Sequence, residues 1–304
     1  MDEKNTRARI NIAVIMSVFC FGCTQTKTQE TVFPTANKKD EKVECEKTRI
    51  QGRYIVQWMD GHSSIEVASS DNQLIEKIIG PQLDQIKFVE PDRRIVFNQD
   101  KGLIGEATNE EMDQEYWGQV MIKAPEVWAQ NILGGGVTVA VIDSGVSLLH
   151  DQLKGQLAVN AGEIPGNGID DDGNGLIDDV AGWNFSTNSP SVRDAFGHGT
   201  HVSGIILADP DAGPMMGVAP KAKLLPLSFM SESGQGGTLG NAILAMEYAA
   251  QQKVQIVNAS WGGADCSKTL KDSIQYLNDK NILFVTASGN DGVDIDERPE
   301  YPAA

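Results

Sequence analysis

From about residue 117 onward, the sequence alternates short apolar runs with amphipathic segments of helical length. The apolar runs are rich in Val, Ile and Leu, which is typical of strands buried on both faces of a sheet. Segments 238–252 and 267–280 place their apolar residues on one helical stripe. This alternation predicts an α/β fold with a parallel sheet and helices on both faces. The predicted strands are residues 137–142, 223–229, 256–260 and 282–287.

Composition divides the preceding residues into shorter segments. Basic residues precede an apolar run at 10–22, which is too short to cross a bilayer but suits the core of an export signal. Residues 24–48 are polar and predict a solvated linker, and the acidic stretch 99–116 predicts a connector. The sequence therefore predicts a signal peptide (1–23), a linker (24–48), a small unit (49–98), a connector (99–116) and the α/β domain (117–304).

Cys23 follows a glycine at the end of the apolar run and precedes polar residues. The pattern resembles a bacterial lipoprotein processing site, in which a lipidated cysteine becomes the new N-terminus and anchors the chain to a membrane. We therefore expect an exported protein, either a lipoprotein of the bacterial cell envelope or an extracellular protein. Plain secretion, or a chance likeness with Cys23 an ordinary small apolar residue, remains the alternative. The four cysteines have the spacing of neither a disulfide framework nor a zinc site.

The small unit 49–98 has strand-like runs at both ends. Residues 53–58 and 86–92 are the predicted strands, and Leu74, Ile78 and Ile79 recur between them at helical spacing. About 50 residues bury only a marginal core. We expect this α+β unit to pack against a neighbour.

Carboxylates dominate the charge of the chain. Lys and Arg number 25 against 42 Asp and Glu, a net charge of −17, which disfavours binding to nucleic acid. The densest acidic stretch lies at 167–179, where aspartate and asparagine alternate as in the start of an EF-hand loop, which predicts structural Ca²⁺. A solvated acidic loop is the alternative. The expected ligands are Asp170, Asp172, Asn174, Leu176 through its carbonyl, and Asp179, with Asp178 as an alternative closing carboxylate.

Three segments carry candidate catalytic groups. Asp143 ends the first predicted strand, at the edge where open α/β sheets build their sites. His198 lies between two glycines at an expected helix start, and Asn290 follows the last predicted strand. Taken alone, each of these residues is common in turns and loops and does not indicate catalysis. In this order, an acid, an imidazole and an amide donor are what acyl transfer by a serine nucleophile requires.

The sequence resembles the subtilisin-like serine proteases over residues 115–304. The resemblance implies that Asp143 orients the imidazole, that His198 is the general base and then the general acid, and that Asn290 donates to the oxyanion. It implies that protein or peptide substrates pair with the strand containing Ser260, Trp261 and Gly262. The blocks that carry it are 115–118, 124–128, 136–145, 197–204, 217–220, 257–263 and 285–291.

The nucleophile of the family is missing from this sequence. In the family the serine begins a helix in a Gly-Thr-Ser-Met-Ala-like segment several dozen residues beyond the oxyanion asparagine, but no serine lies between Asn290 and Ala304. We expect a fragment of a complete endopeptidase. The alternative is a catalytically dead, calcium-stabilised binding protein of the cell envelope.

The unit 49–98 resembles the propeptides of this family, which inhibit their own enzyme and template its folding. A surface-packing module without an inhibitory role is the alternative.

Two other enzyme classes are disfavoured. The glycines at 134–136 precede a strand, whereas a phosphate loop needs them after it, and the four histidines form no His-Glu-x-x-His metalloprotease motif.

Overall fold

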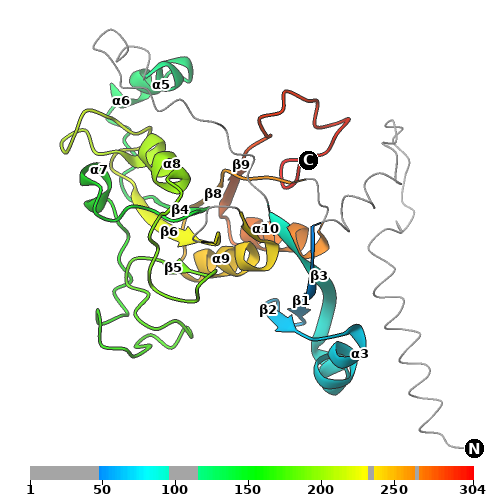
Figure 1. Ribbon diagram of the computed structural model, residues 1–304. Coiled ribbons are helices and arrows are strands. Elements are labelled where there is room, and N and C mark those ends of the chain that lie inside the picture. The colour runs from blue at the N-terminus through cyan, green and yellow to red at the C-terminus, as the bar shows by residue number, and fades with distance from the viewer. Residues whose placement is uncertain (1–47, 96–115, 232–235, 264–266) are drawn as a thin grey trace, which may run out of the picture.

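The computed structural model describes residues 48–95, 116–231, 236–263 and 267–304. The predicted signal peptide with Cys23, the linker up to residue 47 and nearly all of the acidic connector lie outside the described residues. The described part forms two sheets with helices packed around them (Figure 1). None of the helices in these ranges is long and apolar enough to cross a bilayer.

The larger sheet has five parallel strands in the order β5-β6-β4-β8-β9. Four of them are the predicted strands, with bounds that differ from the predictions by at most one residue. The fifth, β5, was not predicted. The strands are β4 (Thr138–Asp143), β5 (Trp183–Asn184), β6 (Lys223–Ser228), β8 (Ile256–Ala259) and β9 (Leu283–Thr286).

Helices cover both faces of this sheet, as the apolar runs predict. Ala140 and Ile142 of β4 pack in the cluster formed with α9 (Leu239–Gln251) and α10 (Lys268–Asp279). Val139 and Val141 pack in a second cluster on the other face, with Leu153 of α7 (Asp151–Lys154) and Leu207 of α8 (His198–Leu207). Successive β4 side chains therefore alternate between two apolar layers. The α/β prediction is confirmed.

The two predicted amphipathic helices begin at side-chain caps. The hydroxyl of Thr238 accepts from the amide of Asn241 (3.2 Å), and that of Ser267 accepts from the amide of Leu270 (3.0 Å). These contacts satisfy amide groups that have no partner within the first turn of a helix. Two further helices precede the sheet, α5 (Trp117–Met121) and α6 (Ala124–Trp128).

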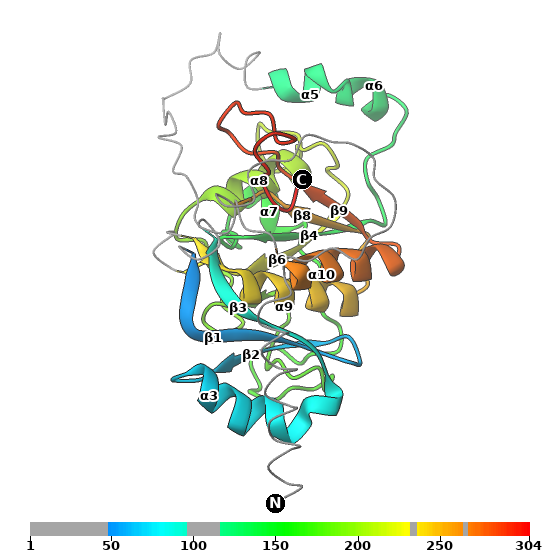
Figure 2. The same cartoon turned by 90° about the vertical axis from the view of Figure 1, so that its right-hand side faces the viewer.

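The smaller sheet is antiparallel, in the order β2-β1-β3-β7. Its first three strands come from the N-terminal unit, and β7 comes from the α/β part, pairing Ile95 with Gly237. One face packs on α9 through Ile55, while the other covers α3 and the helical turns that follow it (Figure 2). The elements are β1 (Arg49–Trp58), β2 (Ser63–Val67), α3 (Asp71–Leu74), further helical turns at Ile75–Ile79 and Gly80–Gln85, β3 (Ile86–Ile95) and β7 (Gly237–Thr238).

Candidate active site

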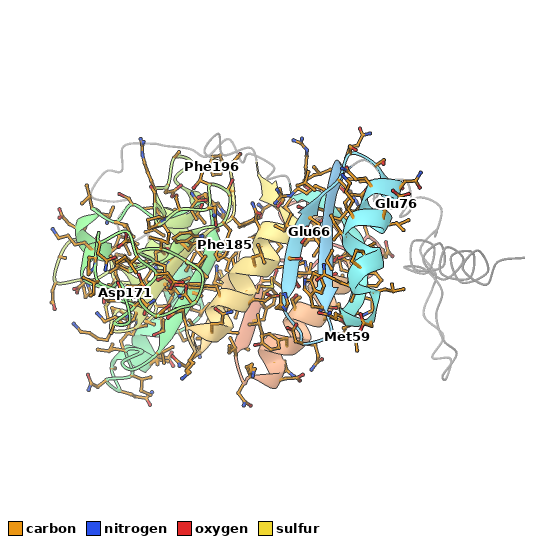
Figure 3. All side chains as sticks on the ribbon, turned by 90° about the horizontal axis from the view of Figure 1, so that it is seen from below. Met59, Glu66, Glu76, Asp171, Phe185 and Phe196 are labelled. Carbon is orange, nitrogen blue, oxygen red and sulfur yellow. The ribbon has the colours of Figure 1, made fainter. Side chains whose placement is uncertain are left out.

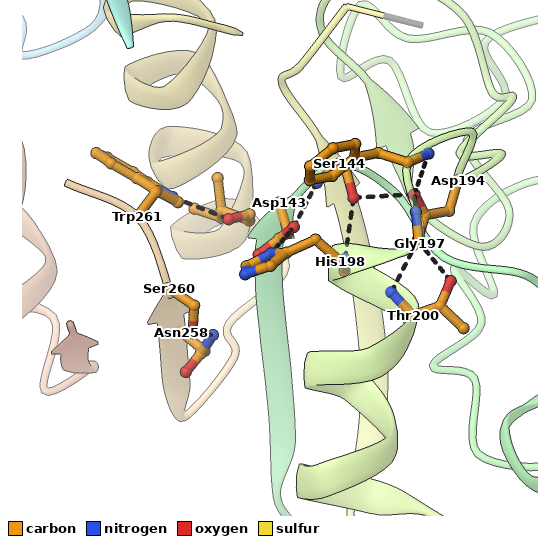
Figure 4. Close-up of polar contacts among 12 residues, drawn as sticks. Asp143, Ser144, Asp194, Gly197, His198, Thr200, Asn258, Ser260 and Trp261 are labelled. Atoms are coloured by element: carbon orange, nitrogen blue, oxygen red, sulfur yellow. Dashed lines mark hydrogen bonds and ion pairs between the residues drawn. The ribbon is translucent and has the colours of Figure 1, made fainter. Parts of the chain in front are cut away.

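Asp143 and His198 lie side by side, where the carboxyl end of β4 meets the N-terminus of α8 (Figure 4). Nδ1 of His198 is 2.7 Å from Oδ1 of Asp143. A carboxylate can only accept a hydrogen bond, so Nδ1 carries the proton and Nε2 is the basic nitrogen. Asp143 is fully buried, whereas the imidazole is 32% exposed. The arrangement presents an oriented base to solvent on one side and a buried acid behind it.

Local glycines make this approach of strand and helix possible. Gly197 precedes the helix with a φ of 94°, a conformation that suits glycine. A side chain on Gly199 would collide with the carbonyl oxygen of Gly145 and approach Asp143. The small residues on either side of His198 therefore allow α8 to begin directly against the end of β4.

Asp194 and Ser144 hold the start of α8 against the end of β4. Ser144 Oγ donates to Asp194 Oδ1 (2.9 Å) and accepts from the amide of Gly199 (2.9 Å). Asp194 also accepts from the amide of Gly197 (2.7 Å) and from both the amide (2.9 Å) and the hydroxyl (2.6 Å) of Thr200. Figure 4 shows this network beside the Asp143–His198 pair.

The hydrogen bonds to Asp194 also determine its ionisation. Partial burial by itself raises the pKa of this carboxyl, but the bonds from Thr200, Gly197 and Ser144 outweigh it, and the pKa lies below its ordinary value. The residue is therefore anionic at neutral pH and can accept from several donors at once. The sequence reasoning missed it, although an aspartate just before a helix start is a recognised N-terminal signal.

The other predicted site residues lie at the same edge of the sheet. Ser260 directly follows β8, and Asn290 lies four residues beyond the end of β9. Because β4, β8 and β9 are consecutive parallel neighbours, their carboxyl ends meet along one edge. Trp261 differs from its neighbours, because its side chain is buried, packs on Phe229 with ring centroids 5.2 Å apart and donates to the carbonyl of Ile142 (2.9 Å). The indole ring is therefore part of the hydrophobic core.

The acidic loop brings together a group of carboxylates that differs in part from the predicted ligand set. Carboxylate oxygens of Glu163, Asp172 and Asp179 all lie within 4.8 Å of one another. Asp170 lies outside this group and instead accepts from the amides of Gly173 (2.8 Å) and Gly175 (2.8 Å), which stabilises the turn. Figure 3 shows Asp171 of this loop at the opposite end of the molecule from Glu66 and Glu76 of the N-terminal unit.

Glu163 was not predicted, because it lies seven positions before the first aspartate of the acidic run. It is buried, and its Oε1 accepts from the amides of Asp171 (3.0 Å) and Asp172 (3.1 Å). Asp179 is also buried and accepts from the hydroxyl of Tyr248 (2.6 Å). Burial and this bond raise the pKa of Tyr248, which therefore remains a donor.

Comparison with known proteins identifies the family. The model of the subtilase family, Peptidase_S8, matches residues 134–304, more than half of the chain. The chain therefore belongs to the subtilase family, and the predicted family membership is confirmed.

Two curated relatives illustrate the likeness. The major intracellular serine protease of Bacillus subtilis (strain 168) is 37% identical over 190 residues, which cover 62% of this chain and 54% of that protein. Subtilisin-like protease 1 of Plasmodium berghei (strain Anka) is 40% identical over 154 residues, covering 50% of this chain and 26% of that protein. The matched region thus spans about half, or less, of these relatives.

A solved structure supports the same fold. Fervidolysin from Fervidobacterium pennivorans, described as a keratinolytic enzyme related to subtilisin, superposes with a TM-score of 0.58 at 22% sequence identity. The match covers 84% of this chain and 42% of that one. At this identity the likeness concerns the fold, and it confirms the subtilisin-like α/β class.

Proposed function

We propose that the chain is part of a serine endopeptidase that hydrolyses peptide bonds by acyl transfer. The observation that carries the proposal is the 2.7 Å contact between Asp143 and His198 at the carboxyl edge of the sheet. Membership of the subtilase family supports it. The nucleophilic serine is proposed to be encoded beyond Ala304, which accords with the partial coverage of the relatives.

In the proposed reaction, Nε2 of His198 takes the proton from the serine hydroxyl while the serine oxygen attacks the scissile carbonyl carbon. Asp143 keeps the proton on Nδ1 and stabilises the imidazolium. Asn290 donates to the oxyanion, the C–N bond breaks, and His198 returns the proton to the leaving amine. Water then releases the acyl group by the same base catalysis.

Hydrolysis of a peptide library by the full-length gene product tests this proposal. His198→Ala should abolish turnover. His201→Ala is the matched control, because His201 lies three residues further along the same helix and is exposed. A full-length protein that is folded but hydrolyses no peptide would favour the non-catalytic alternative.

We propose that residues 49–98 act as an intramolecular inhibitor. Their contacts with the α/β part support this role. Asp92 accepts from the amide of Gly240 at the start of α9 (2.9 Å). Glu90 accepts from the hydroxyl of Ser267 and from the amide of Thr269 (3.3 Å) at the start of α10. Both carboxylates thus lie at helix N-termini, where negative charge is favoured. Inhibition of the full-length enzyme by a 49–98 peptide tests the proposal, and failure to inhibit would refute it.

We propose that Ca²⁺ binds at Glu163, Asp172 and Asp179. Three carboxylates this close repel one another unless a cation neutralises them, and oxygen ligands suit Ca²⁺. Asn160 and Asn174 lie at the same place, each donating an amide N–H to Asp172 and Asp179, and a flip of either amide would present a carbonyl ligand instead. Bound Ca²⁺ would have a structural role, holding the loop between β4 and α8.

Melting of the chain with Ca²⁺ and with EGTA tests this site. Ca²⁺ should raise the melting temperature of the wild type and should do so much less in Glu163→Gln. Glu76→Gln, an exposed carboxylate in the N-terminal unit, should behave as the wild type. An equal Ca²⁺ response in Glu163→Gln and wild type would refute this ligand set.

We propose export with a lipid on Cys23, supported by the basic residues and apolar run that precede it. Mass spectrometry of the cell-associated protein tests this. Absence of the lipid together with release into the medium would favour plain secretion.

A further inference from the structure

Glu300 lies against both backbone segments of the proposed substrate site. Its Oε1 is 3.1 Å from the position that a Cβ on Gly262 would occupy. A Cβ on Gly289 would lie 3.5 Å from the carboxyl carbon of the same residue. Tyr301 fixes the segment in place by exchanging two backbone hydrogen bonds with Gly263 (2.8 and 2.7 Å). The carboxylate is therefore held between the strand proposed to bind substrate and the residue before Asn290.

No hydrogen bond or ion pair joins the Glu300 side chain to another residue in the described part of the chain. Two buried acids in that part, by contrast, have partners: Asp92 accepts from Arg53 (2.5 Å) and Glu247 accepts from the amide of Ser63 (3.1 Å). Partial burial raises the pKa of Glu300, and the charge of Asp291 raises it further. A partly buried carboxylate without a hydrogen-bond partner is stabilised by a cation that reaches it.

Among the described residues, one basic side chain, that of Arg298, acts on Glu300, and it is engaged elsewhere. Arg298 forms an ion pair with Asp291 (3.8 Å). Its positive charge lowers the pKa of Glu300, but by less than burial and the charge of Asp291 raise it. The guanidinium is also largely exposed. The local charge beside Gly262 and Gly289 is therefore negative.

We propose that Glu300 selects substrates with Lys or Arg at the residue whose carbonyl is attacked. This inference rests on the proposed peptidase function. If Asn290 binds the oxyanion, the attacked carbonyl carbon lies beside Asn290. The side chain of that substrate residue is attached to the Cα next to this carbon, so the side chain begins close to Gly289. A long basic side chain can extend between Gly289 and Gly262 and end on the carboxylate.

Two peptide substrates that differ only in Lys and norleucine at this residue test the proposal, because norleucine keeps the aliphatic length and lacks the charge. The full-length enzyme should have the higher kcat/KM for Lys. Glu300→Gln should reduce the Lys-to-norleucine ratio by about ten- to hundredfold, the usual effect of losing a hydrogen bond between charged groups. Glu297→Gln, an exposed acid in the same segment, should leave the ratio within about twofold of the wild type.

Glu300→Lys is a second variant and should reverse the preference toward a peptide with Glu at this residue. Rates are taken per site labelled by a fluorophosphonate, so that loss of folded protein does not change the ratio. A wild type that prefers norleucine, or a Glu300→Gln ratio equal to that of the wild type, would overturn the inference alone. A wild type that hydrolyses none of the peptides would overturn the proposed function itself.

Discussion

Replacing Asp194 by Asn tests whether this residue holds the start of α8 in place. The carboxylate accepts five hydrogen bonds, three from Ser144 and Thr200 and two from the amides of Phe196 (3.0 Å) and Gly197. An Asn side chain offers one carbonyl oxygen with two acceptor sites, so about three donors lose their partner. Each lost bond costs on the order of 1 kcal/mol, and the variant should be less stable by about 2 to 3 kcal/mol.

The predicted loss corresponds to a decrease in melting temperature of about 5 to 10 °C for a domain of this size. Because the pKa of Asp194 is lowered by folding, its stabilising effect is complete above the ordinary value of 3.8 and disappears as the pH falls through the folded value. The stability difference between wild type and Asp194→Asn should therefore be constant near pH 7 and decrease below about pH 4.

Urea denaturation of the 304-residue chain at several pH values measures this difference. Asp151→Asn is the control, because Asp151 is exposed and its main side-chain contact is an ion pair with Lys154. The control should leave the free energy of unfolding close to that of the wild type. If Asp194→Asn changes it no more than the control, the network does not stabilise the start of α8.

Two further substitutions test contacts away from the catalytic pair. Trp261→Phe removes the hydrogen bond to the buried carbonyl of Ile142 and should lower the free energy of unfolding by about 2 kcal/mol. Urea denaturation measures this change, and an unchanged free energy would contradict the buried position of the indole. Asp92→Ala removes the acceptor of the Gly240 amide and leaves Arg53, which donates to Asn241 of α9, without its acid, and it should cost about 2 to 3 kcal/mol of binding. A 49–98 peptide with this change should inhibit about 30- to 160-fold more weakly, whereas Asp84→Ala, at an exposed position, should inhibit as the unmodified peptide does.

The strands and longer helices were predictable because burial leaves a pattern in the sequence. β4 needs apolar residues on both faces, so residues 137–142 stand out as an apolar run interrupted by Thr138 alone. The helix over 238–252 combines an apolar stripe with a Thr cap, and α9 begins and ends within one residue of it. The short β5 and β7 have no such pattern, because two residues pair only where the tertiary fold brings a partner beside them.

The site was predictable only in part. Asp143 and His198 could be paired because strand ends and helix starts of an α/β sheet share one edge, and the structure brings them together. Of the acidic cluster, Asp172 and Asp179 were predicted but Glu163 was not, since Glu163 reaches the cluster through the folding of the loop and not through spacing in the sequence. The orientation of Trp261 depends on the space beside Phe229, which a linear pattern does not contain.

Covalent labelling of the full-length protein with a fluorophosphonate tests the central claim most directly. The reagent reacts with a serine only where an oriented base activates it. We expect one label, on a serine downstream of Ala304, which is lost in His198→Ala and in Asp143→Ala but kept in His201→Ala. An unlabelled wild type that is folded, or a label that persists in His198→Ala, would contradict the proposed catalytic role of the Asp143–His198 pair.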